Sequence, residues 1–292
     1  MRILNNEQIA QGISKRILTN KLSKFLLFIA TLFSLVVLSI LVYRIMNQGL
    51  PKLNLDFLSN FASRRPANAG ISGALVGSIW LMIVVVPFSM VIGVGTAIYL
   101  EEYAKKNWFT SFIQVNIQNL AGVPSIVFGL LGLTIFVRAM DLDRSILAAG
   151  LTMSLLVMPV IVVSAQEALK AVPRQLGEAS YGLGATKWQT IRNIILPAAI
   201  PGILTGSILA ISRAIGETAP LIVVGALAFV NFYPSSIMDS FTVIPIQIYN
   251  WTTRPQIEFQ EVAAAGIIVL LVFLIIMNSI AIIIRNKFNK RY

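Results

Sequence analysis

The sequence predicts an all-α integral membrane protein with six transmembrane helices, and three observations support this prediction. Apolar residues make up 57% of the 292 residues and charged residues only 12%, which is far from the balance of a soluble domain. Uncharged apolar runs recur along the chain, close to or above the roughly 20 residues with which a helix crosses a bilayer. Basic residues concentrate in alternate connections between these runs, as the positive-inside rule describes.

Six runs qualify as membrane spans, and polar or charged residues separate them. In chain order they are 25–42, 73–100, 120–137, 145–165, 200–230 and 262–284. The runs 73–100 and 200–230 exceed one crossing, so we expect each to tilt, bend or protrude. In the second of them the break is expected within 216–220, because Pro220 removes a backbone hydrogen bond and disfavours helix at Ala219.

Six spans place both termini on one side of the membrane, and the basic residues assign that side to the cytoplasm. The predicted organisation is a cytoplasmic segment 1–24, a first span with an outer loop 25–69, a transmembrane domain 70–284 and a basic cytoplasmic tail 285–292. A cleaved signal peptide is the alternative for the first span, but such apolar segments usually have only about 7 to 15 residues. Three aromatic residues after the fifth run are expected at a membrane–water interface: Tyr233, Tyr249 and Trp251.

The composition argues against enzymatic chemistry. The chain has no cysteine and no histidine, so it lacks disulfides, thiol nucleophiles, thiolate ligands and the commonest metal ligand and neutral-pH base. No phosphate-binding G-x-x-x-x-G-K-[ST] loop occurs. We therefore expect no catalytic residue, no metal site and no cofactor in this chain. The net charge of +11 is explained by membrane topology, so no nucleic-acid partner is expected.

The polar stretch 173–197 lies between two apolar runs and is the part of the chain most suited to meet a partner. Pro173 can open a short helix, because its missing N–H is one that a first turn leaves unpaired. Gly182 and Gly184 then supply a break. Two short amphipathic helices joined by a glycine turn can lie on the membrane surface and project into a partner's cleft. An ordinary solvated loop is the alternative.

The second helix of this stretch is expected to begin at Thr186. Thr186 is suited to the N-cap position, and Gln189 three residues later completes the pattern of a capping box. Spacings of three and four place three apolar side chains on one face: Trp188, Ile191 and Ile195. Pro197 is expected to close this helix.

The order of residues in the stretch resembles the EAA loop of permease subunits of ATP-binding-cassette importers. The matched positions are an acidic residue, two small residues, a glycine and a closing apolar group: Glu178, Ala179, Ser180, Gly184, Ile194, Leu196 and Pro197. Ser180 departs from the commonest third alanine but is also small. In that family the loop is the coupling helix that docks on the ATPase subunit. The resemblance implies that Glu178, Ala179 and Gly184 are the docking and turn positions.

Arg213 and Glu217 are the only charged residues within the predicted spans. An ionisable group inside a bilayer is costly, so the pair is a functional hypothesis. Their spacing of four places them on one helix face, and Arg213 lies roughly 20 Å along the span, past the midplane. The pair either neutralises itself and packs helices, or Arg213 offers a planar charged fork to an oxyanion while Glu217 orients it.

Two further segments, SRAIGETAPLIVVG at 212–225 and LAGVPSIVFG at 120–129, resemble bacterial phosphate permease subunits, particularly the A-type partner of a two-subunit channel. The resemblance implies a type I importer permease core, of the MetI-like kind, over 70–284. It also implies a second homologous permease subunit, an ATPase dimer that carries ATP and Mg²⁺, an extracytoplasmic phosphate-binding protein and a bacterial inner-membrane location. Its implied substrate path consists of three residues: Arg213, Glu217 and Thr218.

Two alternatives remain open from the sequence. Permeases for sulfate, molybdate or other solutes share the EAA loop, and only the segment around Arg213 favours phosphate. An ion-gradient-driven secondary transporter would be expected to show inverted repeats and several intramembrane carboxylates. The sequence has no obvious repeat, and Glu217 is its single carboxylate within a span. Vanadate-sensitive uptake would favour the importer, and uncoupler-sensitive uptake the secondary transporter.

Overall fold

The computed structural model of the protein describes residues 6–227 and 229–288, and each regular element in these residues is a helix. Five of these helices are long and apolar enough to cross a membrane, and a bent pair brings the number to six if it is counted as one span. The predicted all-α membrane fold is therefore confirmed. The ends of the predicted N-terminal segment and basic tail, residues 1–5 and 289–292, lie outside the described residues.

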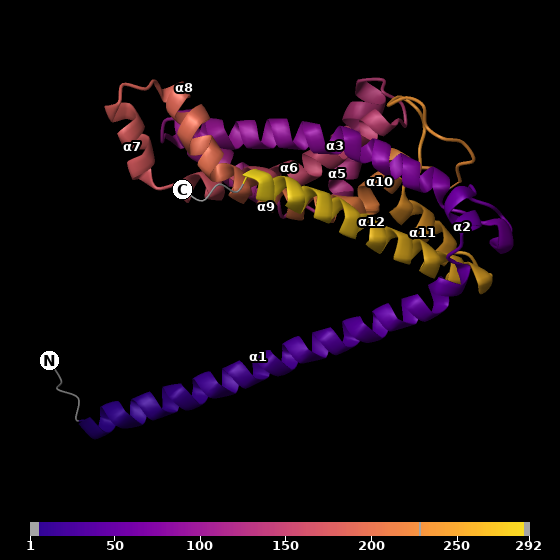
Figure 1. Ribbon diagram of the computed structural model, residues 1–292, viewed down its shortest axis with the longest axis horizontal. Coiled ribbons are helices and arrows are strands. Elements are labelled where there is room, and N and C mark those ends of the chain that lie inside the picture. Colours follow the sequence, from indigo (N-terminus) through magenta and orange to yellow (C-terminus); the bar gives the residue numbers. More distant parts are fainter. Residues whose placement is uncertain (1–5, 228, 289–292) are drawn as a thin grey trace.

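Four helices form the bundle (Figure 1), namely α3 (Ser72–Ile98), α6 (Ile146–Lys170), α9 (Leu196–Gly216) and α12 (Glu258–Phe288). Helix α6 packs against both α3 and α9, and α12 packs along α9. The α6–α9 contact depends on glycine, because a Cβ at Gly206 would lie 2.3 Å from that of Ser164, and one at Gly202 2.8 Å from that of Ala168. Small residues at such spacing let helix backbones approach closely, which drives helix association in lipid.

Helix α1 (Asn6–Gly49) diverges from the bundle and forms a V with α12 (Figure 1). It meets α12 near Gly49, where a Cβ would lie 2.7 Å from backbone atoms of Ala264 and Ala265. The most apolar window of the candidate span Arg16–Lys52 is 0% buried. In a bilayer these side chains face lipid or another chain, since their own bundle does not cover them.

The third predicted span corresponds to a bent pair of helical segments. Its parts are α4 (Trp108–Leu120), α5 (Ser125–Gly132) and the π-helical η4 (Leu133–Ala139). The two halves meet at 106°. The prediction of a span over 120–137 is wrong at its start, because Leu120 is the last residue of α4. Pro124 is the N-cap of α5 and has a ψ of 135°, so the chain turns before the second half begins.

The helix that contains the first part of the fifth run, 200–230, begins in the polar stretch and ends at Gly216. Its parts are α8 (Lys187–Thr190), the π-helical η5 (Ile191–Ile195) and α9, and α10 (Ala219–Val224) lies beyond the break. The expected break is confirmed, since Glu217 has extended backbone and Pro220 lies in the first turn of α10. The prediction that Pro197 closes a short helix is wrong. The wide π-turn just upstream makes room for its ring, and the helix continues into α9.

Short helices close the end of the bundle where α1 meets α12 (Figure 1). They are η1 (Leu50–Lys52), α2 (Leu55–Ser59), η2 (Pro66–Asn68) and α11 (Ile244–Thr252). Trp251 is fully buried there, with its ring centroid 5.8 Å from that of Phe57. The prediction of an interfacial Trp251 is therefore wrong, because the ring fills the core. Tyr233 and Tyr249 are half exposed, and their interfacial position stays a prediction.

The loop between α10 and α11 covers the start of α6. The backbone N–H of Ile146 donates to the carbonyl of Asp239 at 3.1 Å, and that of Leu147 to the carbonyl of Ile237 at 2.8 Å. These bonds satisfy two donors that a helix N-terminus leaves unpaired. The Asp239 carboxylate accepts backbone N–H bonds from Ser235 and Ser236, at 2.7 Å and 2.9 Å, and they hold its pKa below the usual value.

Candidate coupling and substrate sites

A helical hairpin of α7 (Arg174–Gly182) and α8 protrudes at the end of the bundle where α12 finishes (Figure 1). Gly184 has a φ of +83° and open space around its missing Cβ, so the backbone conformation alone calls for glycine. Thr186 Oγ1 accepts from the Gln189 N–H at 3.4 Å, and Gln189 Oε1 accepts from the Thr186 N–H at 2.8 Å. The predicted glycine turn and capping box are confirmed.

The predicted apolar face of the second hairpin helix is only partly buried. Ile191 is buried and Ile195 half-buried, but Trp188 is 57% exposed. The helix changes from α to π geometry at Ile191, and the wider turn shifts the angular phase of the residues that follow. Trp188 precedes this change, lies one turn nearer the tip and projects from the hairpin.

The EAA-like residues fall into two groups. Glu178 and Ala179 are exposed on α7, near the turn at Gly184, whereas Ser180 is half-buried. The Ser180 hydroxyl lies 2.9 Å from that of Thr190 and so joins α7 to α8. A hydroxyl in place of the commonest alanine thus serves to close the hairpin. The other three members lie in the continuing helix below it, half-buried: Ile194, Leu196 and Pro197.

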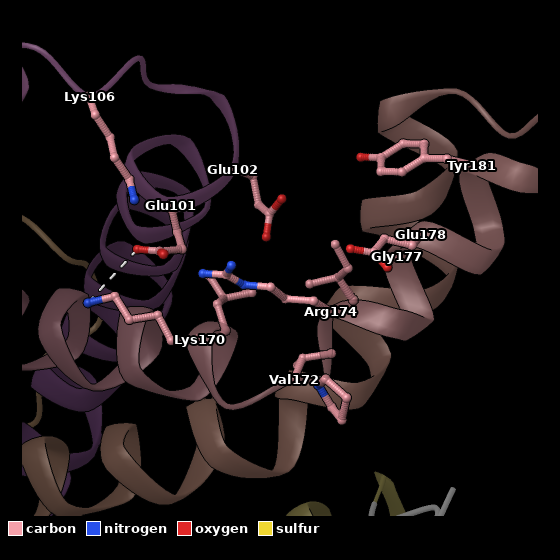
Figure 2. A pocket seen from close by; sticks show the side chains of 12 residues that line it. Glu101, Glu102, Lys106, Lys170, Val172, Arg174, Gly177, Glu178 and Tyr181 are labelled. Carbon is pink, nitrogen blue, oxygen red and sulfur yellow. Dashed lines mark ion pairs between the residues drawn. The ribbon is translucent and has the colours of Figure 1, made fainter.

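An open cleft of about 370 Å³ separates α7 from the end of α3 and its π-helical extension η3 (Tyr99–Tyr103), as Figure 2 shows. Glu101 and Glu102 line one side and Glu178 the other, with the Arg174 side chain extending between them (Figure 2). Lys170 Nζ lies 4.0 Å from Glu101 Oε2. Such exposed ion pairs contribute at most about 1 kcal/mol to stability, so the cleft stays free to rearrange.

A second contact crosses from the hairpin to the same extension. The Lys187 ammonium lies 5.0 Å from the centroid of the Tyr103 ring, within the range of a cation–π contact. The first residue of α8 therefore touches the extension of α3, although the two are far apart in the sequence. Sequence reasoning missed this contact, because only the fold brings the two segments together.

Arg213 and Glu217 form an ion pair, with Arg213 Nε 3.3 Å from Glu217 Oε1. The prediction that they share one helix face is wrong, because α9 ends at Gly216 and Glu217 has extended backbone. The Arg213 side chain is 64% exposed and that of Glu217 only 19%. Arg213 lies in the last turn of α9, beside the bend between α4 and α5, where Ala121 and Phe128 line a small cavity with it. A cation is favoured at the C-terminus of a helix. Thr218 lies between α9 and α10, next to Glu217.

Sequence reasoning missed the exposed apolar tip of the hairpin and one contact beside Arg213. Leu183 is 90% exposed, and together with Trp188 it gives the hairpin an apolar tip. An apolar residue directly before the glycine of a polar turn was the available signal. The missed contact is a hydrogen bond between Ser212 and Asn278. Asn278 is the one side-chain amide in the run 262–284, which also could have drawn attention to it.

The fold and the hairpin together define a class, a multi-pass membrane protein whose bundle is interrupted by a polar helical hairpin at one end. The chain belongs to the family of binding-protein-dependent transport system inner membrane components, whose model matches residues 89–291. The predicted membership of the importer permeases is therefore confirmed.

Curated relatives match most of the chain. A probable ABC transporter permease protein YqgI of Bacillus subtilis is 30% identical over 86% of this chain and 90% of its own length. The phosphate transport system permease protein PstA of Yersinia pestis is 30% identical over 92% of this chain and 90% of its own. PstA of Mycobacterium leprae is 39% identical over 64% of this chain and 61% of its own.

Solved structures share the fold. A bacterial ABC transporter involved in alginate import matches with a TM-score of 0.65 and 16% identity, over 94% of this chain and 100% of that one. The MetNI methionine ABC transporter, in an inward-facing conformation, matches with a TM-score of 0.61 and 17% identity, over 75% of this chain and 96% of that one. The predicted fold of an ABC importer permease is confirmed.

Proposed function

We propose that this chain is the transmembrane permease subunit of an ATP-driven importer of inorganic phosphate. The PstA relatives, named as phosphate transport permeases, support the substrate. The observation that carries it is Arg213, a permanently charged side chain that stays 64% exposed at a helix break within a span. A guanidinium presents paired donors that match the oxygens of an oxyanion.

Glu217 would limit how tightly Arg213 binds an anion. Its carboxylate lies 3.3 Å from Arg213 and satisfies the charge while no anion is present. An arriving phosphate would compete with this carboxylate for the guanidinium, which limits how tightly the anion is held. The Thr218 hydroxyl, next in the chain, would offer a further donor in the substrate path. A transport site must release its cargo. An arginine paired with the Glu217 carboxylate therefore suits transport better than an unpaired arginine would.

The hairpin would couple this path to ATP hydrolysis. Glu178, Ala179 and Gly184 would dock on the partner ATPase, together with the apolar tip at Leu183 and Trp188. The helix then runs from Lys187 to Gly216 and ends beside the substrate path. Closure of the ATPase dimer would tilt this helix and switch the permease between its outward and inward states.

The proposed assembly contains a second homologous permease subunit, an ABC ATPase dimer and an extracytoplasmic phosphate-binding protein. ATP and Mg²⁺ would bind to the ATPase, and this chain would be non-catalytic and hold no cofactor. Both termini would lie in the cytoplasm of a bacterial cell, on the same side of the membrane as the hairpin. Basic residues gather in and beside the hairpin, as expected for a cytoplasmic segment: Lys170, Arg174, Lys187 and Arg192.

The test is the ATPase activity of the complex captured through this chain, reconstituted with its candidate binding protein. Phosphate, sulfate and molybdate are titrated in turn. Stimulation by phosphate alone is the expected result. Stimulation by another anion would contradict the substrate and keep the importer class, whereas a complex without any associated ATPase would contradict the importer itself.

A further inference from the structure

The end of α9 is held to α12 by a polar contact inside the apolar bundle. A hydrogen bond joins the Ser212 hydroxyl to the side-chain amide of Asn278, and the same hydroxyl lies 2.7 Å from the Ile208 carbonyl. Asn278 is the one side-chain amide in the run 262–284. An amide in an apolar span is costly without a partner, so this bond fixes which face of α12 meets α9.

A second contact lies on the same seam. Arg285 Nη1 donates to Thr205 Oγ1 at 3.5 Å. The two contacts are seven residues apart on each helix, from 205 to 212 on α9 and from 278 to 285 on α12. Seven residues are about two helical turns, so the equal spacing places both contacts along one line of two antiparallel helices. Helix α12 is therefore tied to α9 in a defined register.

The contact between Ser212 and Asn278 lies next to the charged pair of Arg213 and Glu217. Ser212 directly precedes Arg213, and α9 ends at Gly216 with extended backbone at Glu217. Backbone groups of the last helical turn have no partners further along their own helix, so a terminal turn needs outside contacts to stay in place. An adjacent face of α9 is fixed nearer the start of the helix, where Gly202 and Gly206 pack on α6. The bond to Asn278 thus acts on the turn that carries Arg213.

We propose that Asn278 is a positioning residue for Arg213, acting through Ser212 to hold the last turn of α9 so that the guanidinium faces the substrate path. This inference rests on the proposed function. Asn278 acts on Arg213 only through Ser212. Its effect is to keep Arg213 in register with Glu217 while the α8–α9 helix moves, so that each ATP-driven switch carries an anion across.

The test uses the whole complex in proteoliposomes with saturating phosphate-loaded binding protein. Asn278→Ala is expected to lower the phosphate transported per ATP hydrolysed roughly threefold to twentyfold, the range that corresponds to hydrogen bonds between helices in lipid. Ser212→Ala should give a similar fall, and the double variant no larger one, because both remove the same bond. The exchange Ser212→Asn with Asn278→Ser should restore most of the ratio. Ser279→Ala, an exposed neighbour on α12, is the matched control.

The ratio separates a positioning role from a structural one. If Asn278→Ala lowers only the amount or the melting temperature of the complex, with the phosphate-to-ATP ratio equal to that of Ser279→Ala, the inference is overturned. A double variant with the summed effects of both single variants would overturn it too. A wild-type complex that transports no phosphate would contradict the proposed function instead, so the two failures are distinguishable.

Discussion

The proposed contact with phosphate depends mainly on one side chain, that of Arg213. It is charged, largely exposed, and placed in the last turn of α9. We expect Arg213→Ala to reduce phosphate uptake at least about a hundredfold, because an uncharged cavity offers an oxyanion no paired donors. Uptake per assembled complex is measured with radiolabelled phosphate.

The controls for this variant test charge and assembly separately. Arg213→Lys keeps the charge and loses the fork, so it should retain only part of the uptake. Arg192→Ala, an exposed arginine in η5, should leave uptake close to wild type. Full uptake by Arg213→Ala in a normally assembled complex would refute contact with the anion.

Asp239 gives the loop over α6 a pH dependence. Backbone N–H bonds lower the pKa of its carboxyl in the folded chain, so the unfolded chain binds more protons in acid. The stabilisation is therefore present above the unfolded pKa, about 3.9, and is lost as the pH falls through the lower folded pKa. Asp239→Asn should lower the melting temperature of the purified chain at neutral pH, and the difference from wild type should shrink below about pH 4. A difference that stays constant with pH would count against the carboxylate.

At the scale of elements, the turn of the hairpin depends on Gly184. Its φ of +83° is strained for a side-chain-bearing residue by about 1 to 2 kcal/mol, and most for a β-branched one. Gly184→Val should tilt α7 against α8 and raise the ATP hydrolysed per phosphate transported. Gly184→Asn should be milder, since Asn tolerates this conformation.

Gly182 supplies the matched control for that turn. It also has open space around its missing Cβ but no positive φ, so Gly182→Ala should leave the ATP-to-phosphate ratio unchanged. Equal ratios for Gly184→Val and wild type would show that the turn does not transmit coupling.

The α6–α9 contact gives an element-scale test of packing. Gly206→Val places a side chain 2.3 Å from the Ser164 Cβ and should cost about 1 to 3 kcal/mol through overpacking. Gly95→Val on α3 adds the same side chain where nothing lies within 4 Å. Thermal unfolding in detergent should show a lower melting temperature for the first variant only. Equal melting temperatures would contradict the close contact.

Element types followed from the sequence, whereas their ends depended on contacts across the fold. Pro220 was enough to predict the break after Gly216, and Thr186 with Gln189 the start of α8. Pro124 and Pro197 both predict a break in a helix. The chain does break at Pro124, which follows a turn, but the helix continues through Pro197, which follows a π-helical segment. The bond between Ser212 and Asn278 joins segments that no local pattern relates. Burial of Trp251 depended likewise on Phe57, which only the tertiary fold brings near it.

At the scale of the whole molecule, the absence of cysteine makes topology directly measurable. An introduced cysteine is the only thiol in the chain. Tyr233→Cys and Leu183→Cys replace exposed residues at opposite ends of the bundle, 50% and 90% accessible. A membrane-impermeant maleimide should label the first in intact cells and the second only after the membrane is opened. Labelling of both sites from outside would contradict the six-span topology.

In the proposed mechanism, the unbroken helix from Lys187 to Gly216 would convert a small rotation of the hairpin into a larger displacement near Arg213. From Lys187 to Arg213 it is about 40 Å long at 1.5 Å per residue. A tilt of about 10° around its lower end would then displace its upper end by about 7 Å, more than the width of a phosphate ion. In the proposed mechanism, a rotation of the hairpin by about 10° would thus be sufficient to carry Arg213 from one side of its cargo to the other.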